Sequence, residues 1–595
     1  MLASAVTPSP SQRLRRALAA VWSHRVDLTC GVILTLTCAV HLSSLEGVVD
    51  LPAWDEADYL RIGVAWPRAA LPDPEWGPLY ALWYSALAAL VEDPVRLFYE
   101  SYRLLIALPA LALYVCVRRF GGPPLIALAG ATAFLLGFGG HVIPRSSLLA
   151  LLVVLTVVAL LSRVRTFTRF AAGLALALLV ASLARPELFL SFVILAGTAF
   201  VSLAVHLRKS AAPKSGQWLR AAPHVGAWLA LVLVVLAVAG NPMSDRSNRR
   251  RFAFCQHFAL GEVQRQKLDL EPWGQCEAVL ARTFGSARSV GEAAASNPKA
   301  FATHALHNLA KYPAASLAIF LREFDHALVH GGAWVPIRQM HALALLTLLG
   351  GAALALARRL REPQGTRPWR TAMLSEPSRR AAAIAFAVLV PTAASSVLIW
   401  PREHYLVLQG VTLFLLSVAV ISSLPQGVPS SRLARLQSVG AVAVIVLFTL
   451  RAPGLELRPL PEQRLENRRV VEALAATSVG ALARQRAREG ESGLGILEAQ
   501  GGYDAYLGPA FRRVSPTDVL PNEPLRSFFY RTGVSAVVIE DRLVGHHRLE
   551  DHPDFDAFFR APEAYGFTVT DVPGTSRRIA YRNFAATAST RTTHR

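Results

Sequence analysis

Long runs of Leu, Ala and Val without charge recur from residue 28 to residue 450 and constrain the fold more than any other feature. A span of the hydrocarbon core takes about 20 mostly apolar residues. Only 17% of the 595 residues are charged, where a soluble protein carries about a quarter. The sequence therefore predicts an α-helical polytopic membrane protein. We expect about eleven spans, near 27–46, 101–118, 123–141, 146–162, 170–184, 188–207, 223–240, 340–357, 380–400, 404–422 and 435–451.

The charged residues lie between these runs in short clusters, which indicates how the chain crosses the membrane. A net charge of +20 can indicate a nucleic-acid partner. Scattered basic clusters are instead typical of cytoplasmic loops, so we expect a lipid bilayer and no nucleic acid. Segment 47–77 holds six acids against two arginines, which places it outside. This asymmetry predicts a cytoplasmic N-terminus and an extracytoplasmic C-terminus.

Two apolar segments do not fit the simple count of spans. Residues 78–91 are too short to cross easily, and residues 313–330 carry two acids, an arginine and two histidines. We interpret both as interfacial helices. If 313–330 crosses the membrane, the sidedness of everything after it inverts.

After about residue 452 the composition changes to that of a soluble domain. Residues 462–486 predict one charged helix, and the runs GLGILEAQ, SAVVIED and FTVTDV predict strands between helical stretches. That alternation predicts a soluble α/β domain. Glu540 and Asp541 follow a predicted strand, as ordinary turn residues would. We interpret the C-terminal domain as a lid or an acceptor-docking module. The predicted domains are a cytoplasmic segment 1–26, a membrane domain 27–451 with external loops 47–100 and 241–339, and the α/β domain 452–595.

The five cysteines leave one question open. Cys255 and Cys276 share a polar loop, and they form a disulfide only if that loop lies in an oxidising compartment. No spacing of His, Cys or carboxylates specifies a metal. We expect no cofactor, with a divalent ion left as an alternative.

Ionisable residues gather in four places on the predicted external side. Such residues at membrane depth are costly and usually functional or paired, although each group alone is also compatible with a solvated loop. The four groups are Asp55, Glu56, Asp58 and Tyr59; His141 with Arg145; Arg185 with Glu187; and Arg402, Glu403, His404 and Tyr405.

The order of several motifs resembles the GT-C glycosyltransferases, in particular the branch with aminoarabinose transferases and protein O-mannosyltransferases. The Asp55-Glu56 pair with Tyr59 follows the first predicted span. After it come GPLYALWYSAL at 77–87, YRLLIALPALALY at 102–114 and a His-Tyr-Leu run at 404–406. The resemblance covers about residues 27–425 and implies a GT-C-like membrane domain of a bacterial inner-membrane enzyme.

This resemblance also implies a reaction. A polyprenyl-phosphate sugar would be the donor, and an extracytoplasmic lipid, glycan or protein would accept the sugar with inversion. A carboxylate must act as general base; Asp55 is the first candidate, Glu56 would support it, and Asp58 leaves the identity of the base open. Arginines suit a departing phosphate. The residues expected to bind substrate are Tyr59, Arg145, Arg185, Glu187, Arg402, His404 and Tyr405.

Two other functions are compatible with the same sequence. A transporter or flippase of a lipid-linked saccharide would often show related halves, and no repeat is visible. A non-catalytic scaffold would tolerate replacement of Asp55 and Glu56.

Overall fold

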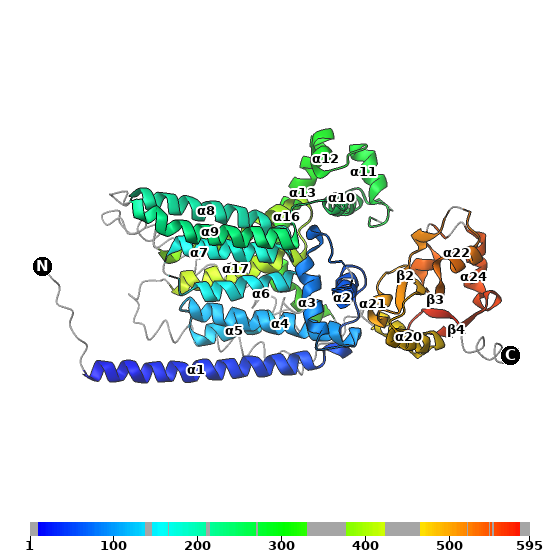
Figure 1. The fold of residues 1–595 in the computed structure, drawn as a ribbon, viewed down its shortest axis with the longest axis horizontal. Helices are drawn as coiled ribbons and strands as arrows, with labels where there is room; N and C mark the ends of the chain where they lie inside the picture. Colours follow the sequence, from blue (N-terminus) through cyan, green and yellow to red (C-terminus); the bar gives the residue numbers. More distant parts are fainter. Residues whose placement is uncertain are drawn as a thin grey trace. The chain divides into compact units, whose positions relative to one another are not determined.

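The computed structural model (Figure 1) describes residues 10–136, 146–209, 215–329, 376–422 and 465–583, apart from 69, 165, 269, 271, 521, 547 and 550–551. The chain folds into two compact units. The helical unit comprises Met1–Leu42, Asp73–Gly77 and Leu105–Glu456. The sheet unit comprises Ser43–Pro72, Pro78–Leu104 and Leu457–Arg595. The segment predicted as the first external loop (47–100) therefore lies mostly in the same unit as the C-terminal residues.

The helical unit is built from long apolar helices, drawn side by side in Figure 1. α7 packs between α6 and α8, and α16 contacts both α8 and α17. Two helices, α1 and α4, begin or end in the sheet unit. The bounds are α1 Pro10–Ser43, α4 Pro94–Arg119, α5 Pro124–Leu136, α6 Ser146–Leu161, α7 Phe167–Ser182, α8 Leu188–Lys209, α9 Ser215–Ala239, α16 Glu376–Leu398 and α17 Glu403–Ser422.

Among the described residues, four helical segments are long and apolar enough to cross a membrane: Arg25–Gly47, Pro94–Arg119, Leu188–Arg208 and Ala222–Ala239. Shorter apolar helices lie at Ser146–Leu161, Phe167–Ser182, Ala382–Leu398 and Tyr405–Leu416. On α9, the side chains of Val234 and Val238 are 56% and 81% exposed. Exposing apolar side chains to water is unfavourable, and lipid around the helix would remove that cost. These features are compatible with a multi-pass membrane protein. The predicted count of eleven is not confirmed, and 340–357 and 435–451 lie outside the described residues.

The predicted external loop 241–339 contains a small helical subdomain around an aromatic core. Its helices are α10 Arg249–Gln266, α11 Cys276–Phe284, α12 Val290–Ser296 and α13 Pro298–Val329. Phe254, Phe258 and Phe284 are among the buried residues of this core. Residues 313–329 of the segment predicted as an interfacial helix are helical, but they form the second half of α13, which continues through Pro313.

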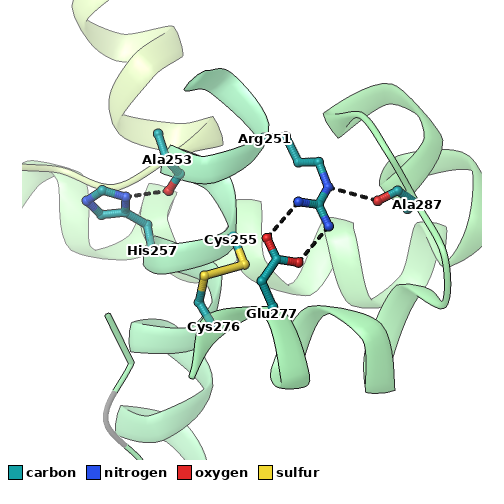
Figure 2. The surroundings of a disulfide bond; sticks show 7 residues. All are labelled: Arg251, Ala253, Cys255, His257, Cys276, Glu277 and Ala287. Atoms are coloured by element: carbon teal, nitrogen blue, oxygen red, sulfur yellow. Dashed lines mark hydrogen bonds and ion pairs between the residues drawn. A yellow bond between two sulfur atoms is a disulfide. The ribbon is translucent and has the colours of Figure 1, made fainter. Parts of the chain in front are cut away.

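A disulfide joins α10 to α11 in this subdomain, which answers the question that the sequence left open. Cys255 and Cys276 have Cα atoms 5.4 Å apart and are both buried. Beside the bridge, Arg251 donates to both carboxylate oxygens of Glu277 at 2.6 Å and to the Ala287 carbonyl at 3.0 Å (Figure 2). Bidentate pairing of this kind fixes geometry as well as charge.

The described residues of the sheet unit form a five-stranded sheet in the order β2-β1-β3-β5-β4. β2, β1 and β3 are parallel, with Leu494 opposite Phe511, and β5 is antiparallel to both β3 and β4. Its core includes Phe528, Phe529, Phe555 and Phe558. The strands are β1 Leu494–Leu497, β2 Phe511–Val514, β3 Val534–Ile539, β4 Phe567–Asp571 and β5 Arg578–Arg582.

Three strands, β1, β3 and β4, confirm the predicted β-branched runs. β2 (FRRV) and β5 (RIAYR) were not predicted, because their arginines hide the apolar positions. The single helix predicted at 462–486 is wrong: Thr477 is extended there, and its hydroxyl accepts the Gly480 N–H at 3.1 Å as an N-cap. Hydroxyl capping of this kind starts a new helix.

The other helices of the sheet unit and the 3-10 helices are all short. They are η1 Leu45–Gly47, α2 Asp55–Ala65, η2 Pro74–Trp76 (in the helical unit), α3 Pro78–Ala88, α19 Glu466–Ala476, α20 Ser478–Glu489, α21 Tyr503–Leu507, η5 Pro516–Asp518, α22 Leu525–Thr532, α23 Asp541–Val544, α24 Pro553–Arg560 and η6 Pro562–Tyr565.

Candidate functional site

The acidic motif of the first loop forms the first turn of α2. Three carboxylates at a helix N-terminus are stabilised by the helix dipole. The helical period then separates them: Asp55 and Asp58 are exposed, whereas Glu56 is 2% exposed. Asp58 accepts a hydrogen bond from Arg61 at 2.7 Å. The two exposed carboxylates are therefore the ones that a substrate can reach.

Glu56 lies between α2 and α3, where two tyrosines contact it. The hydroxyls of Tyr80, at 2.5 Å, and Tyr84 donate to Glu56 Oε1. Burial, followed by the charge of Glu56, raises the pKa of both tyrosines well above the usual value. Tyr59 packs edge-on against Tyr80, with ring centroids 5.1 Å apart. Glu56 and Tyr59 therefore hold α2 on α3 from the buried face.

A glycine sets the distance between these two helices. A Cβ on Gly63 would lie 2.5 Å from the Ala81 carbonyl oxygen and 2.6 Å from the Tyr84 Cβ. The α2–α3 pair is thus closely packed, and the acidic turn is held on a rigid support.

The acidic turn also meets the carboxyl edge of the parallel sheet, where open α/β sheets usually bind ligands. α2 and α21 are neighbours within the sheet unit (Figure 1). Arg61 Nε lies 3.9 Å from an Asp504 carboxylate oxygen, and Asp504 is 5% exposed. The edge that could take a ligand in an isolated domain is here covered by the first external loop.

Two buried carboxylates end the central strands at this edge. Glu498, fully buried after β1, accepts the N–H groups of Gly502 at 2.9 Å and Tyr503 at 3.2 Å. Burial raises the pKa of Glu498 to about 7. Glu540, after β3, lies 3.2 Å from Arg577 Nε; burial raises its pKa, against the effect of Arg577. Because Glu540 is 6% exposed, the prediction of an ordinary turn residue is wrong.

The helical unit brings together other residues that the sequence singled out. Arg185, between α7 and α8, donates through Nε to Glu187 at 2.7 Å. Its guanidinium carbon lies 4.8 Å from the ring centroid of Tyr405 at the start of α17. Arg185 is 6% exposed, so a permanent positive charge is held near the ends of three apolar helices. Arg185 and Tyr405, which the sequence placed in two separate groups, therefore lie in contact.

Of the remaining candidate residues, Arg402 makes a separate contact in the helical unit, and the others, in whole or in their side chains, lie outside the described residues. Arg402 lies 4.7 Å from the Trp273 ring in the disulfide-containing subdomain. Burial, followed by the charge of Arg402, lowers the pKa of the neighbouring His257 to about 3, so His257 is neutral. His141 and Arg145 lie outside the described residues, as do the side chains of Glu403 and His404.

Sequence reasoning missed several residues of the site. Tyr80 and Tyr84 stand four apart in the short apolar helix, a spacing that puts both on one face, and this could have signalled a buried polar partner. Glu75 is buried and accepts hydrogen bonds from Ser244 at 2.9 Å and Ser247 at 2.8 Å. Although burial acts to raise the pKa of Glu75, these bonds lower it. No local pattern indicates that long-range contact.

No protein-family model matches the chain, and no curated protein matches it either. Among the described residues, one group of possible metal ligands converges, namely Cys255, Cys276 and Glu277. The two sulfurs of that group form the disulfide, and the carboxylate is paired with Arg251.

Proposed function

We propose that this chain is a membrane glycosyltransferase of the GT-C kind that moves a sugar from a polyprenyl-phosphate donor to an extracytoplasmic acceptor. The observation that carries the proposal is the acidic first turn of α2, which presents Asp55 to solvent on a support buried through Glu56. An exposed carboxylate on a rigid element suits a general base, because geometry matters before pKa.

The proposed reaction is a single displacement. The acceptor hydroxyl gives its proton to Asp55 while its oxygen bonds to the anomeric carbon. The bond from that carbon to the phosphate oxygen breaks, and the polyprenyl phosphate leaves with the electron pair. Asp58, whose carboxylate accepts a hydrogen bond from Arg61, is the second candidate base. On the resemblance to the GT-C enzymes, we assign the base role to Asp55 and a supporting role to Glu56.

The leaving phosphate needs positive charge as it departs. Arg185, held by Glu187 and Tyr405, is our first candidate; Arg402, His404 and Arg145 remain proposals on the resemblance alone. Glu187 and Tyr405 would then orient the guanidinium, and Tyr59 would act through its packing on Tyr80.

The disulfide supports the proposed topology, because such bridges persist in oxidising compartments. With Cys255 and Cys276 outside, the disulfide-containing subdomain would face the same compartment as the acceptor. We place the enzyme in a bacterial inner membrane, with the N-terminus inside and the sheet unit outside.

The test is transfer of labelled sugar from polyprenyl-phosphate donors in membranes that contain the wild type, Asp55→Asn or Asp58→Asn. We expect Asp55→Asn to lower the rate by about 10²- to 10⁴-fold at normal protein levels, since that is the contribution of a general base. Glu92→Gln is the matched control, because Glu92 is an exposed acid in the same external region, and it should retain activity.

Three other outcomes would change the proposal. Loss of transfer only in Asp58→Asn would move the base to Asp58. Transfer that survives both substitutions would remove the acidic turn from catalysis. No transfer by the wild type with any donor sugar would leave the flippase or the scaffold, which net transport of a labelled lipid-linked saccharide in vesicles would separate.

A further inference from the structure

We propose that the turn 500–506 of the sheet unit positions the catalytic carboxylate of the first external loop, with Gly502 and Tyr506 as positioning residues. The catalytic half of this inference rests on the proposed function; the docking half does not. The C-terminal residues would then be an integral part of the active site rather than a separate lid or acceptor module.

Two hydrogen bonds hold the loop immediately before Asp55. The Trp54 N–H donates to the Gly501 carbonyl at 2.8 Å. The Tyr506 hydroxyl donates to the Pro52 carbonyl at 2.7 Å, and Tyr506 is buried. The backbone from residue 52 to residue 54 is thus fixed from one side by the turn.

Further bonds from α19 extend this contact toward the membrane span. The N–H groups of Asn467 and Arg468 donate to the Asp50 carboxylate at 3.0 and 2.9 Å. The Asn467 side chain donates to the Leu51 carbonyl at 2.7 Å. Every one of residues 50–52 and 54 therefore has a partner in the C-terminal part of the sheet unit.

The backbone of Trp54 adopts a conformation that needs such support. Its φ is +64° and its ψ is −130°, and the backbone of a non-glycine residue is strained in this region. Trp54 is the N-cap of α2, so its backbone sets the direction in which the helix starts. The hydrogen bond from the Trp54 N–H to the Gly501 carbonyl therefore fixes the residue whose backbone sets the direction of Asp55.

Gly502 brings the turn into direct contact with α2. Its φ is +139°, and an added Cβ would lie 2.7 Å from the Ala57 Cβ and 3.4 Å from the Ala53 Cα. Glu498 fixes the turn in place by accepting the Gly502 and Tyr503 N–H groups. Because Glu498 anchors the turn 500–506, a methyl group at residue 502 must displace the first turn of α2 away from the sheet.

A small displacement at this point is enough to affect catalysis. A misplacement of about 1 Å can cost about 10²-fold in rate. The displaced group is the proposed base and not a residue proposed to hold the departing phosphate, so we expect the loss in kcat rather than in the KM of the donor.

The test compares Gly502→Ala with Gly508→Ala in the full-length protein. Gly508 also has a left-handed φ, +95°, but an added Cβ there meets nothing within 4 Å. Both variants carry backbone strain, and only the first meets Ala57. We expect Gly502→Ala to lower kcat by about 10- to 10²-fold with little change in donor KM, and Gly508→Ala to stay near the wild type.

Ala57→Gly in the Gly502→Ala background provides the rescue, because it removes the atom that the new methyl meets. We expect the double variant to recover kcat to the level of Ala57→Gly alone. Hydrogen exchange at residues 50–58, with the β3 amides as a folding control, reports docking without any need for activity. It should accelerate in Gly502→Ala and return toward normal in the double variant.

The outcomes separate the two proposals. If Gly502→Ala matches Gly508→Ala in both exchange and kcat, or if Ala57→Gly fails to rescue, the positioning proposal is overturned and the glycosyltransferase proposal stands. If exchange behaves as expected but the wild type transfers no sugar, docking holds and its catalytic purpose falls with the proposed function.

Discussion

At the residue scale, adjacent acids take different parts in the structure. Asp55 and Glu56 look like a pair in the sequence, but neighbouring positions of a helix do not face each other. Asp55 is exposed, and Glu56 is buried against two tyrosine hydroxyls. A substitution at Glu56 would therefore act on the packing of α2, whereas Asp55→Asn removes the proposed base with little change in shape.

Glu498 gives a prediction about pH. Its pKa is raised from 4.5 to about 7 in the folded chain, so the folded state favours the protonated acid. The associated stability is complete below about pH 4.5 and is lost as the pH rises through about 7. The loss amounts to roughly 3 kcal/mol, and Asp504, whose pKa burial also raises, adds in the same direction.

We expect hydrogen exchange of the β1 amides to accelerate as the pH rises from 5 to 8, after correction for the intrinsic rate. In Glu498→Gln the exchange should depend less on pH, because the amide still accepts hydrogen bonds but does not ionise. A variant that follows the wild-type curve would show that another group carries the pH dependence.

At the scale of elements, the disulfide closes the connection from α10 to α11. The two cysteines are 21 residues apart, and a loop of that length is stabilised by about 3 kcal/mol. We expect Cys255→Ser/Cys276→Ser to expose α11 to trypsin at Arg282. Reductant should do the same to the wild type and add nothing in the double variant. Equal cleavage of the oxidised wild type and the double variant would contradict this stabilising role.

The short helices of the sheet unit show how local signals compete. The sequence predicts one charged helix at residues 462–486, but the Thr477 hydroxyl caps a second helix, so the first one ends before it.

The strands β2 and β5 contain arginines that a single-sequence pattern excludes from strands, but pairing with β1 and β3 places them in the sheet. Neighbouring strands outweigh propensity in both strands.

At the scale of the whole molecule, shared folding restricts the topology. Residues 43–72 and 457–595 belong to one compact unit, so in the proposed membrane topology they must lie on the same side. The chain between them must then cross an even number of times. Ten of the eleven predicted spans fall in that interval, which agrees with an even number, and an additional span at 313–330 would not.

We therefore expect a reporter fused after residue 583 and one inserted near residue 70 to give the same external signal. A reporter at the N-terminus should give the internal one. Alkaline phosphatase, which is active outside, and green fluorescent protein, which is fluorescent inside, are the measurements. Opposite signals from the first loop and the C-terminus would contradict the shared unit.

The sequence alone determined the apolar helices, three of the five strands found in the described residues and the acidic motif after the first predicted span, because periodicity, propensity and composition are local. The helix that carries this motif was not predicted. The sequence did not determine that Glu56 is buried, that Gly502 lies against Ala57, or that Arg185 meets Tyr405. Those depend on contacts between residues tens to hundreds of positions apart, for which one sequence holds no local signal. The tertiary structure decided them because a buried polar group needs a partner, and only the folded chain supplies it.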